Sequence, residues 1–255
     1  MTFPEVSVSL FPFTLLDKLE GLKALDPAVR KLQPRVRDSL GPSQVKDLLH
    51  GKALGHPLHP ILVQLPIGCW TSALLLDLLP GKRQRAAADA LAVTGVLAAL
   101  PAAASGAADW SELNPSKART GLVHAVANDV ALTLWVGSVR ARRKGRRGRG
   151  VLLGLLGGAA VAVGGTIGGH LAYRQGAGVD QNAAVADIGL RRWTDAGAFD
   201  DLPDGQLTLR RAGSVDVVLL RTGQGVAGLV DRCSHQAGPL HQGRIVDDGE
   251  RCVVC

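Results

Sequence analysis

The sequence predicts an α + β protein: a bundle of four transmembrane helices followed by a small all-β domain that we expect to continue beyond residue 255. Three observations support this prediction. Four apolar stretches lie between residues 57 and 173, a period-two pattern rich in β-branched residues begins near residue 206, and three of the four cysteines lie within residues 233–255.

The composition favours a membrane protein over an ordinary soluble domain. Hydrophobic residues make up 46% of the chain but aromatic residues only 4%, and the mean hydropathy is +0.15. The net charge of +7 could suit a nucleic-acid partner. However, many of the basic residues lie in two loops between apolar stretches, without interleaved aromatic residues, so we expect no nucleic-acid binding.

Each apolar stretch is long enough for a spanning helix, which needs about 20 mainly apolar residues. The last stretch contains no Asp, Glu, Lys or Arg, and the others carry polar residues mainly near their ends. A soluble bundle of buried helices is the alternative, but these stretches lack amphipathic faces. The predicted helices cover residues 57–79, 86–108, 120–139 and 150–173.

Charge in the loops predicts the orientation of the helices. Residues 80–85 and 140–149 are strongly basic, whereas the only basic residues within 109–119 are Lys117 and Arg119. Because positively charged loops stay in the cytoplasm, both termini should be extracytoplasmic in a four-span protein of the cell membrane. Arg146-Arg147 could alternatively belong to a twin-arginine export signal.

The soluble parts flank the predicted bundle. Residues 15–40 are predicted to form short amphipathic helices broken by Pro27 and Pro34. Alternating β-branched residues later in the chain predict antiparallel strands at 206–210, 215–220 and 226–230, and a hairpin of 245–246 with 252–254. The predicted divisions are a mixed helical segment (1–55), a four-helix transmembrane domain (56–174), a linker (175–193) and the β domain (194–255).

The β domain contains three candidate metal ligands. Cys233 and His235 precede a Gly238-Pro239 turn, and Cys255 follows after a predicted hairpin that can return the chain beside this turn. Thiolates bind iron strongly, and neutral imidazoles make an iron–sulfur cluster less negative, which raises its potential to roughly −150 to +300 mV. A fourth ligand, a histidine three positions after Cys255, is expected beyond the chain end.

Residues 230–240 and 249–255 resemble the Rieske [2Fe–2S] family, and the similarity extends over about residues 194–255. The resemblance implies that Cys233 and Cys255 bind one iron of a [2Fe–2S] cluster and that His235 binds the other. Gly238 stands where members from respiratory complexes have an extra cysteine. The chain therefore looks more like the ferredoxin-like or oxygenase-type branch.

A zinc site is the alternative for the same residues. Cys233, His235, Cys252 and Cys255 could form a Cys₃His zinc site, and unligated thiols remain a further option. His241 could be an extra ligand, but we expect it to be a solvated loop residue.

Four histidines fall near the predicted outer end of the membrane bundle: His56, His59, His124 and His170. They could bind haem b through two axial ligands, bind a metal ion, contribute to a quinone site, or only form structural hydrogen bonds. The His-Pro-Leu-His-Pro sequence at 56–60 resembles an uncharacterised family of four-helix bacterial membrane proteins, over about residues 50–175. That resemblance implies a membrane location and no known activity.

Together these features predict a membrane-anchored iron–sulfur electron-transfer protein. It would pass single electrons between a membrane donor, either a quinol or a haem, and a redox partner protein. We expect an electron carrier rather than a stand-alone enzyme. The alternatives are a component of a Rieske-type oxygenase or reductase system, and a zinc-binding or redox-sensing membrane protein.

Overall fold

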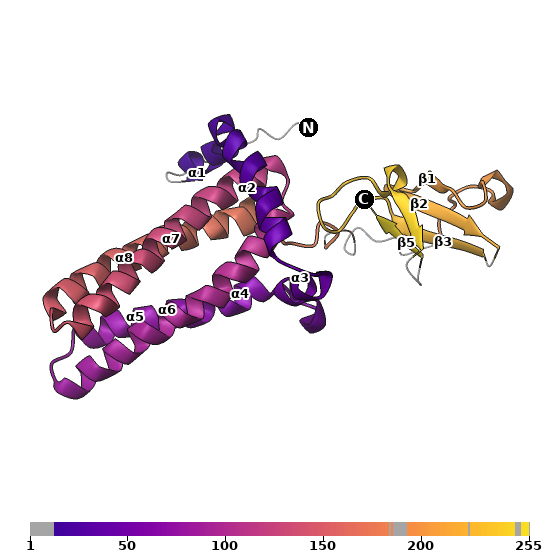
Figure 1. The fold of residues 1–255 in the computed structure, drawn as a ribbon. Coiled ribbons are helices and arrows are strands. Elements are labelled where there is room, and N and C mark those ends of the chain that lie inside the picture. Colours follow the sequence, from indigo (N-terminus) through magenta and orange to yellow (C-terminus); the bar gives the residue numbers. More distant parts are fainter. Residues whose placement is uncertain (1–12, 184, 186–192, 224, 248–250, 255) are drawn as a thin grey trace. The chain divides into compact units, whose positions relative to one another are not determined.

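The computed structural model describes residues 13–183, 185, 193–223, 225–247 and 251–254. The chain divides into two compact units, Met1–Gln175 and Gly176–Cys255. The first is helical and the second contains the β-strands, so the predicted fold class is confirmed (Figure 1).

The helical unit contains four segments that are long and apolar enough to cross a membrane. The first consists of two short helices that follow each other, and the other three are long helices. The last three are longer than the apolar stretches alone suggested, because charged residues extend these helices beyond their apolar parts. The helices are α1 (Phe13–Glu20), α2 (Asp26–Ser39), α3 (Ser43–Leu49), α4 (Leu58–Leu62), α5 (Gln64–Asp77), α6 (Lys82–Ser111), α7 (Pro115–Arg143) and α8 (Arg147–Gly169).

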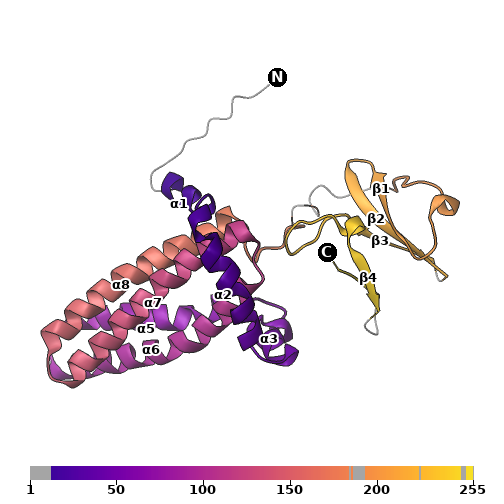
Figure 2. The same ribbon diagram turned by 45° about the horizontal axis from the view of Figure 1, so that its top comes forward.

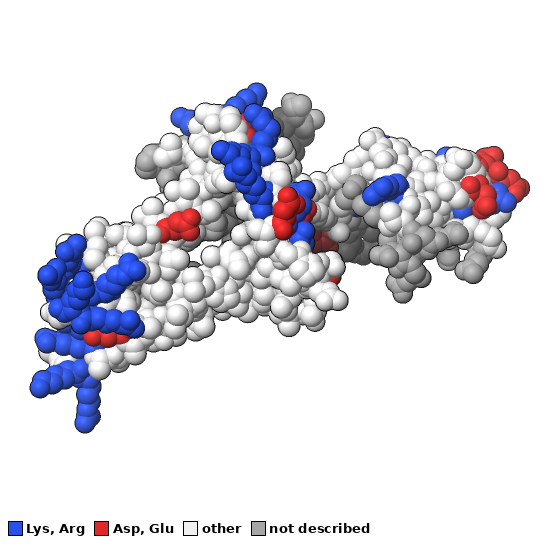
Figure 3. Space-filling model, viewed as in Figure 1, with Lys and Arg blue, Asp and Glu red and all other residues white. Residues whose placement is uncertain are grey.

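The four spans form two antiparallel hairpins. Helices α4 and α5 pair with α6, and α7 pairs with α8 (Figures 1 and 2). The turns within the two hairpins lie at the same end of the bundle, where Lys and Arg side chains gather (Figure 3). At the other end a short link joins α6 to α7, and the side chain of Asn114 accepts a hydrogen bond from Lys117 N at 3.1 Å, which caps α7. The basic loops predicted to share one side of the membrane therefore lie together.

The N-terminal helices pack against this opposite end. Gln33 Nε2 donates to the carbonyl oxygens of Trp110 and Leu113, at 3.1 and 2.9 Å. The expected break at Pro34 is wrong, because α2 continues through this residue. Pro27 does stand in the first helical turn, where its missing N–H removes no helical bond.

A repeated spacing relates the two hairpins. Trp70 on α5 and Trp135 on α7 stack with ring centres 5.3 Å apart and planes at 3°. These residues are 65 positions apart, as are the histidines at 59 and 124. On the second helix of each hairpin, Gly95 lies against Trp70 and Gly157 against Trp135. The bundle therefore has equivalent positions that meet in pairs between the hairpins, since the first helices of both run in the same direction.

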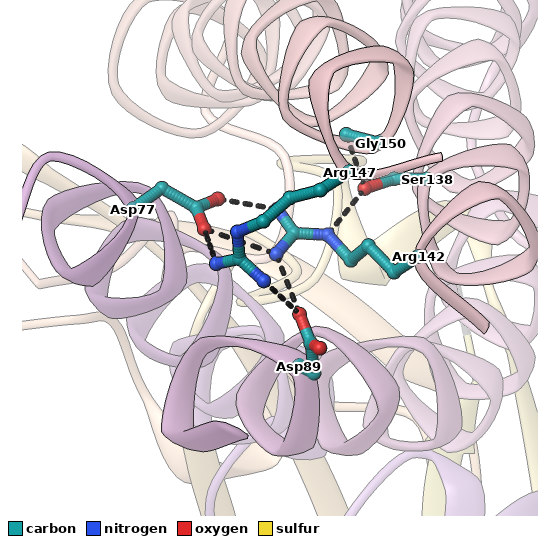
Figure 4. A network of polar contacts seen from close by, with 6 residues as sticks. All are labelled: Asp77, Asp89, Ser138, Arg142, Arg147 and Gly150. Carbon is teal, nitrogen blue, oxygen red and sulfur yellow. Dashed lines mark hydrogen bonds and ion pairs between the residues drawn. The ribbon is translucent and has the colours of Figure 1, made fainter. Parts of the chain in front are cut away.

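The third pair of positions with this spacing is Asp77 and Arg142, which form an ion pair at the basic end (Figure 4). Both side chains are only 2% exposed. Asp89 on α6 accepts from Arg142 at 2.8 Å, and Arg147 on α8 lies 2.5 Å from Asp77. The network thus joins all four spans, and its two carboxylates and two guanidinium groups balance in charge.

The C-terminal unit contains a three-stranded antiparallel sheet in the order β1-β2-β3, and a separate hairpin of β4 and β5. Leu207 pairs with Leu220, Val217 with Val230, and Val246 with Cys252. The predicted strands and the predicted hairpin are confirmed. The strands are β1 (Leu207–Ala212), β2 (Val215–Thr222), β3 (Gly225–Val230), β4 (Arg244–Asp247) and β5 (Arg251–Val254).

Candidate metal centre

The predicted ligands Cys233 and His235 lie in a tight loop directly after β3. Cys233 N donates to Gly238 O at 2.7 Å, and Ala237 N donates to Cys233 O at 2.9 Å. Ala237 adopts a left-handed conformation, with φ of 61°, which lets the chain turn back within so few residues. The loop is therefore closed by hydrogen bonds of its own backbone.

This loop presents its two ligands differently. Cys233 is 7% exposed, whereas His235 is exposed to solvent. A buried cysteine and an exposed histidine can offer one soft thiolate and one imidazole nitrogen. This donor set fits one edge of a cluster that is bound by both cysteine and histidine.

Asp231 and His241 form a pair that links the two ends of this loop. The pair was not predicted from the sequence. The Asp231 side chain is 5% exposed and accepts from the backbone N–H of His241 at 2.6 Å. His241 Nδ1 lies 2.5 Å from the other carboxylate oxygen. His241 is thus not a solvated loop residue. The only signal for this pair in the sequence is an aspartate directly after a predicted strand, followed ten positions later by a histidine.

Residues after the membrane unit also contact the Cys233 loop. Gln181 N donates to Ser234 O at 2.8 Å, and Asn182 Nδ2 donates to Arg232 O at 2.7 Å. The segment predicted as a linker therefore supplies hydrogen bonds to the loop that carries the candidate ligands.

The remaining cysteine ligand cannot be placed. Cys255 lies outside the described residues, and of Cys252 only the backbone pairing in β5 is described. Among the side chains that the structure describes, no group of three His, Cys, Asp or Glu is gathered to hold a metal ion.

The four membrane histidines do not form one cluster. His59 on α4 and His124 on α7 lie side by side, with ring centres 6.3 Å apart. His56 is exposed just before α4, and its Nδ1 lies 3.1 Å from Pro57 O. His170 is buried after α8, and its Nε2 lies 3.6 Å from an oxygen of Asp17.

The four histidines look equivalent in the sequence, and the pairing of His59 with His124 was not predicted. Its signal is the spacing His-x₁₀-Trp, which occurs at 59–70 and again at 124–135. The glycines opposite show the same interval, at 95–106 and 157–168.

Comparison with family models identifies both parts of the chain. Residues 55–181 match the family described as "Predicted membrane protein (DUF2231)". Residues 192–255 match the Rieske [2Fe–2S] domain.

Searches of curated proteins and of solved structures found no match to the chain. The Rieske match implies a [2Fe–2S] cluster, and the loop at Cys233 offers part of the donor set that such a cluster needs. The chain is therefore a membrane protein in which a domain of the DUF2231 family is fused to a Rieske [2Fe–2S] domain.

Proposed function

We propose that this protein passes single electrons between a membrane donor and a redox partner protein through a cluster whose ligands include Cys233, His235 and Cys255. The observation that carries the proposal is the match of residues 192–255 to the Rieske domain, together with the closed loop at Cys233. A bound cluster would supply reversible one-electron chemistry.

The chain's own residues would position the cluster and limit its contact with water. Cys233 would bind from the buried side of the loop, where Asp231 and His241 fix the backbone. His235 would bind from the exposed side. The imidazole edge is then the place where a partner protein comes closest to the cluster.

The membrane unit would supply the donor, either a quinol or a haem.

We place the basic turns of both hairpins in the cytoplasm and both termini on the extracytoplasmic side, since basic loops stay inside (Figure 3). Labelling of a cysteine introduced at Lys144 tests this orientation: protection from an impermeant maleimide in intact cells supports it, and rapid labelling contradicts it.

The cluster is tested by electron paramagnetic resonance of the reduced full-length protein, purified without exposure to air. We expect a rhombic signal with the low average g value of a histidine-ligated cluster. Replacing Cys233 by Ser should abolish this signal, because the loop would lose its thiolate ligand.

Cys69→Ser is the matched control. Cys69 is also a buried cysteine, but it lies on α5 in the membrane unit. This variant should keep the full signal. A protein that gives no signal and contains stoichiometric zinc would refute the proposal in favour of the Cys₃His site.

A further inference from the structure

The strongest unassigned feature of the molecule is the contact between His59 and His124. Their ring planes are at 86° and their ring centres are 6.3 Å apart. The two residues occupy equivalent positions on the first spans of the two hairpins, one layer away from the Trp70–Trp135 stack. Imidazoles are costly to place in lipid, so a matched pair calls for a partner or a ligand.

The backbone fixes the same nitrogen in both rings. His59 Nδ1 lies 2.9 Å from Ala102 O, and His124 Nδ1 lies 2.8 Å from Gly164 O. Since a carbonyl oxygen can only accept a hydrogen bond, Nδ1 must carry the proton in both residues. Each neutral ring then keeps a lone pair on Nε2, which is the arrangement of a metal-binding histidine whose other nitrogen is held by a carbonyl.

Glycines hold both rings in place. A Cβ on Gly106 would lie 2.7 Å from Cε1 of His59, and a Cβ on Gly168 would lie 2.8 Å from Cε1 of His124. Each glycine stands four residues after the carbonyl that its histidine contacts. The two rings are therefore oriented by the same device on α6 and α8.

Asn128 is the other polar group at this pair. Its Nδ2 lies 3.4 Å from Nδ1 and 3.2 Å from Nε2 of His124, and it donates to the carbonyl oxygen of His124 at 2.9 Å. Because Nδ2 is nearly equidistant from the two ring nitrogens, it lies over the face of the ring. Asn128 therefore does not lie along the in-plane direction of the Nε2 lone pair.

The number of ligands selects the kind of metal centre. In the described part of the chain no third His, Cys, Asp or Glu joins this pair to complete a site for a bare ion. A haem iron already has four porphyrin nitrogens and needs only two axial ligands. Two imidazoles on opposite sides of a metal, each at about 2 Å, have ring centres roughly 6 Å apart, close to the separation observed here.

We propose that His59 and His124 are the axial ligands of a haem bound between the two hairpins. This haem would serve as the membrane donor only if the proposed function is also correct, and it would then supply the single electron that the cluster receives. Haem binding itself does not depend on the cluster.

The proposal is tested by adding hemin to the full-length protein in lipid nanodiscs, purified with an affinity tag that contains no histidine. We expect about one haem per chain, with the Soret shift and sharp visible bands of low-spin, bis-histidine iron after reduction. His59→Gln and His124→Gln should each lose this spectrum. Glutamine can still donate to the backbone carbonyl, so these variants separate coordination from structural hydrogen bonding.

His56→Gln and His170→Gln are the matched controls and should keep the spectrum, because neither residue lies at the pair. Cys233→Ser should also keep it, which distinguishes failure of this proposal from failure of the proposed cluster. The proposal is overturned if the wild type gives no low-spin spectrum, if all four glutamine variants keep it, or if the purified protein contains a stoichiometric bare metal at this pair.

Discussion

The two membrane hairpins present equivalent residues to each other in two layers and opposite residues in a third. Histidine meets histidine and tryptophan meets tryptophan, but Asp77 meets Arg142. Neutral rings can face a copy of themselves at little cost. Two like charges with side chains only 2% exposed would repel strongly in a low-dielectric environment. The hairpins are therefore alike where the paired groups are neutral and complementary where they are charged.

The largest effect should come from breaking the charged layer. Arg142→Gln removes the main partner of the buried Asp77 carboxylate, and loss of one member of a buried pair costs about 3–5 kcal/mol. Because Arg147 still reaches Asp77, we expect the lower end of this range. The measurement is thermal unfolding in detergent, followed by size-exclusion chromatography. The variant should show a lower melting temperature than the wild type.

Arg143→Gln is the control for this prediction, since Arg143 is the exposed neighbour on the same helix. It should leave the melting temperature almost unchanged. Asp77→Asn combined with Arg142→Gln should recover part of the loss, because it removes the uncompensated charge. Equal stability of the Arg142 and Arg143 variants would show that the network contributes little.

A smaller effect is expected in the tryptophan layer. A Cβ on Gly157 would lie 2.7 Å from Cδ1 of Trp135, whose ring is fully buried against Trp70 and cannot move aside. Gly157→Ala should therefore destabilise the bundle by about 1–3 kcal/mol through overpacking. Thermal unfolding, monitored by tryptophan fluorescence, measures the change.

Gly165→Ala provides the comparison on the same helix, because nothing lies within 4 Å of a Cβ there. This variant should be neutral or slightly stabilising, since alanine favours the helix over glycine. If Gly95→Ala, in the equivalent place against Trp70, proved harmless while Gly157→Ala did not, the two hairpins would be less alike than their contacts suggest.

The smallest effect concerns the loop of the C-terminal unit. Asp231→Asn keeps an oxygen for the His241 N–H but weakens the contact with Nδ1, which should cost about 1 kcal/mol. We expect faster loss of the cluster signal on warming. Asp216→Asn, at a side chain that is 58% exposed, should not change the rate of loss. Identical rates in both variants would refute a bracing role for Asp231.

The fold could be predicted well from the sequence because its signals are local. An uninterrupted apolar stretch such as 150–173 predicts a spanning helix, and alternation in 215–220 predicts a strand. The break expected at Pro34 failed because packing of α2 against the α6–α7 link outweighs one missing hydrogen bond.

The candidate sites were predicted only in part. Cys233 and His235 are close in sequence, and together with the Gly238-Pro239 turn they predict a metal-binding loop, which stays a prediction. Asp231 and His241 were missed as a pair because a contact across ten residues depends on how the loop closes.

The sequence by itself determined the four spans, the change to a β domain and the cysteine and histidine spacing typical of a Rieske domain, since each depends on residues that are near neighbours in the chain. The tertiary structure decided which distant residues meet. It paired His59 with His124 and Asp77 with Arg142, and it left His56 and His170 apart from that pair. Such pairings arise only when helices 65 residues apart pack face to face, and no local pattern encodes the angle at which they do so.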